Sequence, residues 1–103
     1  MDLSQMQEML SQASAMRDSM EEALAHTVVE ASSGGGAVEV RMNGRKELLK
    51  LTITPAAASA AAADITMLED LIVAAINEAG RKADQAAQSS AGDMLGGLGL
   101  PGF

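Results

Sequence analysis

Hydrophobic positions in the first quarter of the chain recur every three or four residues. The apolar positions of this segment are Leu3, Met6, Leu10, Ala13, Met16, Met20 and Leu24. Polar and acidic residues fill the positions between them, so the segment has the period of one face of a helix. No glycine or proline occurs before residue 34, and we therefore expect an uninterrupted amphipathic helix over residues 3–24.

In the middle of the chain the apolar positions follow a period of two. β-Branched residues at 27–29 favour a first strand. Apolar residues alternate with polar ones over 38–43 and again over 49–54, the pattern of half-buried strands. The turn-forming segment Ser32–Gly36 separates the first two strands, and Pro55 ends the third because proline lacks the N–H that a sheet ladder needs. These residues predict a three-stranded antiparallel meander.

A second helix follows the strands, after an alanine-rich segment. Its apolar stripe consists of Ile65, Leu68, Ile72, Ala75, Ile76, Ala79, Ala83 and Ala86. Asp64 can cap this helix, because a carboxylate at the N-cap accepts hydrogen bonds from the free N–H groups of the first turn. Residues 56–63, nearly all alanine, are expected to form a loop or a loose helical turn.

Helix, three strands and helix, in that order, indicate an α+β fold. The 103 residues predict a single domain, which we place at residues 1–88. Residues 89–103 are rich in glycine and contain Pro101, so we expect a flexible tail there. The three strands present one apolar face, and we expect both helices to cover it.

The composition predicts a thin hydrophobic core. Hydrophobic residues make up 48% of the chain, but aromatic residues only 1%, and most of the apolar content is Ala, Met, Leu and Val. Small side chains bury little area each, and burial stabilises by roughly 25 cal/mol per Å². Small chains with thin cores are often stabilised by a second copy, so we expect an obligate homodimer.

Three consecutive glycines, Gly34–Gly36, raise the question of a phosphate-binding loop. In nucleotide-binding proteins such a loop lies between a strand and a helix, whose first amide groups meet the phosphate. Here the residues after Gly36 predict a strand, and the sequence has neither G-x-G-x-x-G nor Gly-Lys-Ser/Thr after the glycines. We interpret the glycines as a flexible β-turn.

Basic residues gather in the middle of an otherwise acidic chain. The net charge is −7, which by itself argues against a phosphate-rich partner. The cations between residues 41 and 50 are Arg41, Arg45, Lys46 and Lys50, and Glu47 is the one acid among them. The chain therefore holds a central basic segment between two acidic helical ones.

The Asn43-Gly44 pair favours a two-residue type I′ turn. That turn would place Arg41 opposite Lys46 and, together with Lys50, on the sheet face away from the apolar residues. Like charges that oppose one another across strands destabilise a sheet, and a bound anion or phosphate would relieve the repulsion. The alternative is that these long side chains extend into solvent near a glutamate.

Several classes of site lack the residues they need. There is no cysteine, and His26 is the single histidine, so we expect no metal centre, no cofactor, no catalytic nucleophile–base arrangement and no enzymatic activity. No apolar run approaches the roughly 18 residues of a membrane span. The polar face of the first helix is acidic, whereas helices on membrane surfaces are basic there. A cytoplasmic protein without membrane contact is the expectation.

Three segments resemble the YbaB/EbfC family of bacterial nucleoid-associated proteins. They are SSGGGAVEVRMNGRKELLKLTITP, MLEDLIVAAINEAGRKA and the terminal GGLGLPG, and the resemblance extends over nearly the whole chain. It implies a helix–strand–strand–strand–helix protomer in a tweezer-like homodimer. It also implies binding of double-stranded DNA with weak sequence preference, a role in nucleoid organisation and gene regulation, and no catalysis. The family's basic helix positions correspond to Arg17, Arg81 and Lys82.

Two hypotheses follow. In the first, the protein is a nucleoid-associated homodimer that binds double-stranded DNA non-specifically, using the central basic group with Arg81 and Lys82, doubled by symmetry. The candidate DNA-binding residues are Arg17, Arg41, Arg45, Lys46, Lys50, Arg81 and Lys82. In the second, the protein is an acidic dimeric adaptor with little affinity for DNA, whose tail or first helix contacts a protein partner.

Overall fold

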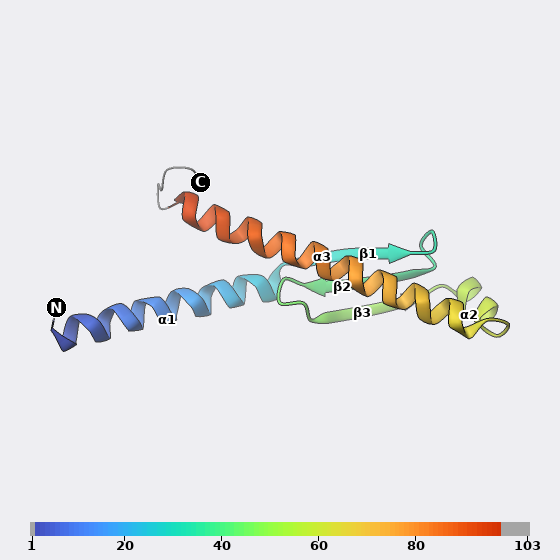
Figure 1. Ribbon diagram of the computed structural model, residues 1–103, viewed down its shortest axis with the longest axis horizontal. Helices are drawn as coiled ribbons and strands as arrows, with labels where there is room; N and C mark the ends of the chain where they lie inside the picture. The colour runs from blue at the N-terminus through green and yellow to red at the C-terminus, as the bar shows by residue number, and fades with distance from the viewer. Residues whose placement is uncertain (1, 98–103) are drawn as a thin grey trace.

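The structure, a computed structural model, describes residues 2–97, and of residues 91 and 93–97 the backbone alone. Its elements are α1 (Leu3–His26), β1 (Val28–Ser33), β2 (Val38–Asn43), β3 (Leu48–Ile53), α2 (Pro55–Ala61) and α3 (Ile65–Gly97). The predicted α+β class and the helix–meander–helix order are confirmed, with the short helix α2 as an addition (Figure 1).

The core lies between α3 and one face of the antiparallel sheet, whose strand order is β1-β2-β3. Val38 and Val40 of β2 are 0% and 1% exposed, and Ala75, Ala79 and Ala83 of α3 are all fully buried. These alanines are four residues apart and so share one face of the helix. Because each side chain is a single methyl group, α3 packs closely on the valines.

The first helix does not cover the sheet, so that expectation was wrong. α1 projects away from the sheet (Figure 1) and has no buried residue. The radius of gyration is 19.8 Å, against roughly 13 Å for a compact domain of this size. The apolar side of α1 is therefore uncovered within one chain, and Leu10 is 68% exposed.

The glycine triplet forms the turn between β1 and β2, as interpreted from the sequence. Gly34, Gly35 and Gly36 all have positive φ, at 62°, 67° and 94°. Side chains with a Cβ rarely adopt this backbone conformation, whereas glycine does so at little cost. The Gly36 N–H donates to the carbonyl of Ser33 at 3.2 Å, which closes the turn. The triplet connects two strands and begins no helix.

The turn between β2 and β3 differs from the expected type I′ turn. Gly44 does not have the positive φ that this turn requires, and Lys46 has it instead, at 65°. The N–H of Asn43 donates to Glu47 O at 3.0 Å, so the loop contains three residues rather than two. This shifts the register, and Arg41 faces Lys50 instead of Lys46.

Two helical segments also differ from expectation, the alanine-rich segment and the end of α3. Residues 55–61 form the helix α2, capped by Thr54, whose hydroxyl accepts from the N–H of Ala57 at 3.2 Å. The cap predicted at Asp64 is confirmed, because its carboxylate accepts from the N–H of Met67 at 3.1 Å. The following helix does not end before residue 89 but continues to Gly97. The remainder of the expected tail, residues 98–103, lies outside the described residues.

The close packing of α3 gives a first prediction. Ala79→Leu inserts three carbon atoms between α3 and β2, and such overpacking costs about 1–3 kcal/mol. We expect urea denaturation at fixed protein concentration to show this loss in the free energy of unfolding. Ala74→Leu, on the exposed face of the same helix, should change it by less than about 0.5 kcal/mol. Equal losses in the two variants would contradict the packing described.

Candidate nucleic-acid interface

The seven basic residues lie on several elements. Arg17 lies in α1, Arg41 in β2, Lys50 in β3, and Arg81 and Lys82 in α3, while Arg45 and Lys46 lie in the β2–β3 turn. The structure brings five of them into two groups. The first group, Arg41, Lys50 and Lys82, lines the open face of the sheet. The second, Lys46 and Arg81, lies beside α3 on the other side of the molecule.

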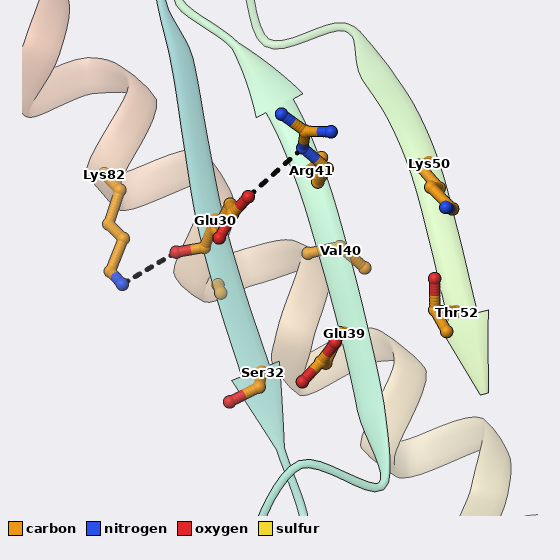
Figure 2. A pocket seen from close by; sticks show the side chains of 9 residues that line it. Glu30, Ser32, Glu39, Val40, Arg41, Lys50, Thr52 and Lys82 are labelled. Atoms are coloured by element: carbon orange, nitrogen blue, oxygen red, sulfur yellow. Dashed lines mark hydrogen bonds and ion pairs between the residues drawn. The ribbon is translucent and has the colours of Figure 1, made fainter. Parts of the chain in front are cut away.

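Two rows of polar side chains cross the open face of the sheet. The antiparallel register aligns Glu30, Arg41 and Lys50 in one row across the three strands. The next row is Ser32, Glu39 and Thr52. These side chains line a shallow depression on the face that α3 leaves uncovered (Figure 2). The expectation that Arg41 and Lys50 share the face away from the core valines is therefore confirmed.

Glu30 organises the cations at the β1 side of this face. Its carboxylate lies 3.2 Å from Nε of Arg41. Its backbone carbonyl accepts a hydrogen bond of 2.7 Å from Nζ of Lys82, which reaches around the outer edge of β1 (Figure 2). Lys82 thus joins a sheet face opposite to the one on which its own helix packs.

Lys50 lies directly across from Arg41 in the register. Two cations opposed across neighbouring strands destabilise a sheet by their repulsion. Lys50 takes part in none of the ion pairs formed among the described residues. The row therefore ends, at β3, in a cation that a negatively charged ligand could neutralise.

Lys46 was expected on this face, and the structure places it elsewhere. Its Nζ lies 3.3 Å from Oδ2 of Asp84 in α3. Its Cε atom would be 3.4 Å from a Cβ built on Gly80, so the side chain crosses α3 where that helix has no side chain. The cause is the three-residue turn, which removes Lys46 from the strand ladder.

Arg81 lies next to this position and is held by its own helix. Its Nε donates to Oε2 of Glu78 at 3.0 Å. This hydrogen bond, together with the positive charge of Arg81, lowers the pKa of the Glu78 carboxyl below its usual value. The group Lys46–Arg81 is thus a pair of cations, each already beside a carboxylate.

Among the described side chains, four cations have a carboxylate oxygen within 4 Å. They are Arg41, Arg45, Lys46 and Arg81. The partner of Arg45 is Glu47, whose Oε1 lies 3.9 Å from Nε of the arginine. All eight side chains of these pairs are between 43% and 69% exposed. Exposed pairs contribute only about 0–1 kcal/mol, so a phosphate group can compete for the cation at little cost.

Glu30, Ser32 and Thr52 were not singled out from the sequence. The hydroxyl groups of Ser32 and Thr52 flank the cations and can donate to phosphate oxygens. The strand register could have identified them, because it shows which side chains of β1 and β3 lie on the same face as Arg41. Arg17, by contrast, was a candidate from the sequence, but it lies on α1 and belongs to neither basic group.

The described part of the chain holds no cluster of metal ligands and no membrane-spanning helix. Among residues 2–97, no three histidine, cysteine or acidic side chains gather as metal ligands would. His26, the last residue of α1, is exposed. None of the described helices combines the length and the apolar content needed to cross a bilayer.

Comparison with known proteins agrees over almost the full length. The family model described as the YbaB/EbfC DNA-binding family matches residues 1–98. A nucleoid-associated protein of Acidobacterium capsulatum is 66% identical over 99 residues, which cover 93% of this chain and 92% of the relative. One from Koribacter versatilis is 46% identical over 96 residues, 93% of each chain.

A solved structure shares the fold. The crystal structure of an uncharacterized protein from Helicobacter pylori superposes with a TM-score of 0.74 and 27% sequence identity, over 92% of this chain and 98% of that one. Because that structure has the same helix–meander–helix arrangement, the sheet and α3 belong to the fold that the two proteins share. By fold and by sequence, this chain belongs to the YbaB/EbfC DNA-binding family.

Proposed function

We propose that this protein is a nucleoid-associated homodimer that binds double-stranded DNA through the phosphate backbone. The observation that carries the proposal is membership in a DNA-binding family, with relatives that are named nucleoid-associated proteins. The role is structural, in nucleoid organisation and through it in gene regulation, and the site of action is the nucleoid in the cytoplasm. The family is a DNA-binding family rather than an enzyme family.

Exposed apolar side chains support the homodimer. Along α1, the exposed apolar side chains are Leu3, Met6, Met9, Leu10 and Met16, each about half exposed or more. In β3, the side chains of Leu48, Leu49 and Leu51 are between 41% and 53% exposed. Methionine adapts its shape to a partner surface, and β3 is an edge strand with free backbone groups. A second copy that covers these positions would supply the core that one chain lacks.

The open sheet face is the best-supported contact for DNA. It combines Arg41 and Lys82 with Lys50, which forms no ion pair with any side chain that the structure describes, and hydroxyl groups lie beside them. A homodimer presents this group twice. Contacts to phosphate and to sugar position a protein without reading sequence, which fits weak sequence preference.

The adaptor hypothesis also has an observation in its favour. The net charge is −7, and four of the seven cations already face carboxylates. An acidic dimer of this kind could bind a basic protein segment instead of DNA. The terminal residues 98–103, a second candidate contact for a protein partner, lie outside the described residues.

The salt dependence of DNA binding separates these functions. Three cations on each of two subunits would displace about six counterions, so the slope of log K against log salt should be about −5. In a mobility-shift titration, the double variant Arg41→Gln, Lys50→Gln should make this slope less negative by about 4, one unit for each cation lost from the dimer. The matched pair Lys46→Gln with Arg81→Gln tests the second group. Absence of a shift at low salt, with the dimer intact, would favour the adaptor.

The homodimer is tested by sedimentation velocity. The parent protein should sediment as a dimer at micromolar concentration, and Leu49→Lys with Leu51→Lys should shift it toward the monomer, because charge would replace the exposed apolar side of β3. Thr52→Lys, in the same strand but on the polar face, serves as the control. A monomeric parent protein, or equal effects of all variants, would count against this interface.

The pKa of Glu78 reports whether DNA reaches Arg81. The pKa is lowered in the folded protein, so the stabilisation by this pair is present at neutral pH and is lost as the pH falls through the folded-state pKa. A phosphate group that binds Arg81 should raise the Glu78 pKa toward its ordinary value, as observed by NMR titration of the carboxyl carbon. Arg81→Gln should raise it without DNA. An unchanged pKa on binding would exclude Arg81 as a contact.

A further inference from the structure

The first helix is attached to the rest of the chain at one end. α1 has no buried residue among its 24, and only its last turns are partly covered, at Met20, Leu24 and Ala25. Within one chain, the direction of α1 therefore depends on the contacts of its C-terminal end. Hydrogen bonds to this end come from Asn43, the last residue of β2, and from Gly44 in the β2–β3 turn. We call residues 43–47 the joint.

The backbone of the joint holds the end of α1 directly. The N–H of Gly44 lies 2.9 Å from the carbonyl oxygen of Leu24 and 2.9 Å from that of Thr27. Carbonyl groups in the last turn of a helix have no partner within the helix. The joint supplies a donor to one of them, and it does so at the point where the chain leaves α1 for the sheet.

Asn43 ties the joint together and extends the link. It is 3% exposed, and its Oδ1 accepts from the N–H groups of Arg45 and Glu47, both at 3.0 Å. Its Nδ2 donates to Oε1 of Glu47 at 2.8 Å and to the carbonyl oxygen of Ala25 at 3.4 Å. One buried amide thus fixes the turn and contacts the last turn of α1.

Gly44 permits the close approach that these bonds require. A Cβ at this position would lie 2.9 Å from Cδ2 of Leu24 and 3.0 Å from its carbonyl oxygen. The second of these is a backbone atom, so a Cβ at residue 44 would require the end of α1 to move by a few tenths of an ångström. Its φ is not positive, so the reason for glycine here is space and not backbone conformation.

The same turn also contacts α3. Lys46, three residues after Asn43, extends over Gly80 and meets Asp84 at 3.3 Å. The joint therefore contacts both long helices, α1 through residues 43 and 44 and α3 through residue 46. Figure 1 shows α1 and the C-terminal part of α3 extending from the sheet on the same side, with this turn where they diverge.

We propose that the joint sets the angle between α1 and α3, with Asn43 and Gly44 as positioning residues. Its consequence for DNA rests on the proposed function. A dimer that engages DNA at several places needs fixed spacing between its contacts, and binding weakens when the geometry prevents simultaneous engagement. Asn43 and Gly44 would then control DNA affinity without touching DNA.

Spin-label distances test the joint in the full-length chain, which has no cysteine of its own. Gln12→Cys with Gln85→Cys reports the separation of α1 from α3, and Thr52→Cys with Gln85→Cys reports the separation of the sheet from α3. All three positions, residues 12, 52 and 85, are exposed. Labelled chains are diluted into an excess of unlabelled protein, so that distances within one chain dominate.

We expect Gly44→Ala to shift or broaden the α1–α3 distance distribution and to leave the sheet–α3 distribution unchanged. Gly92→Ala is the matched control, because a Cβ there meets nothing within 4 Å. Asn43→Asp is the second variant, since aspartate keeps the acceptor oxygen and loses the donation to Ala25 and Glu47. An unchanged α1–α3 distribution in both variants would overturn the proposal, and so would loss of the sheet–α3 distance, which would mean that the turn stabilises the whole domain.

DNA affinity supplies the second readout. With all seven cations present, Gly44→Ala should bind DNA about tenfold more weakly than the Gly92→Ala control. Equal affinities despite a displaced α1 would overturn the functional half of the inference. A parent protein that binds no DNA would overturn the proposed function instead, while the distance measurements would still decide the role of the joint.

Discussion

The contact between the alanine face of α3 and the valines of β2 is the constraint on which the fold depends. Ala75, Ala79 and Ala83 let the helix lie close to Val38 and Val40, and the core between them is thin. A core of methyl groups and valines buries little area per residue, and area is what stabilises a domain. The leucines of β3 and the methionines of α1 remain outside this core, an arrangement that supports the proposed homodimer.

The secondary structure was largely predictable because its signals are local. The alternation in β2 and the stripe in α3 are periodic patterns, and each element buries the side that its pattern indicates. The β2–β3 turn was not predictable from the Asn-Gly pair, because the side chain of Asn43 accepts from two backbone N–H groups and favours a longer loop. The position of α1 was not predictable either, since an amphipathic period identifies an apolar face but not what covers it.

The candidate site was predictable in composition and only partly in arrangement. The pairing of Arg41 with Lys50 follows from the register, and the register depends on a turn of one extra residue. The contact of Lys46 with Asp84 joins two residues that are 38 positions apart in the sequence. The contact of Lys82 with Glu30 joins two that are 52 positions apart. Such contacts leave no local pattern. They show how an acidic chain can hold its cations beside carboxylate or carbonyl oxygens and still present them to solvent.

Lys82 has a consequence that concerns the limits of assembly. Its ammonium group occupies the carbonyl of Glu30 on the outer side of β1, and a lysine there discourages another strand from adding. Among the described residues, no side chain forms a hydrogen bond to the outer backbone groups of the opposite border, at β3. In the proposed homodimer, two copies that meet at β3 would leave only their β1 borders outward, each covered by Lys82. Lys82 would thereby favour a closed pair over an endless fibre.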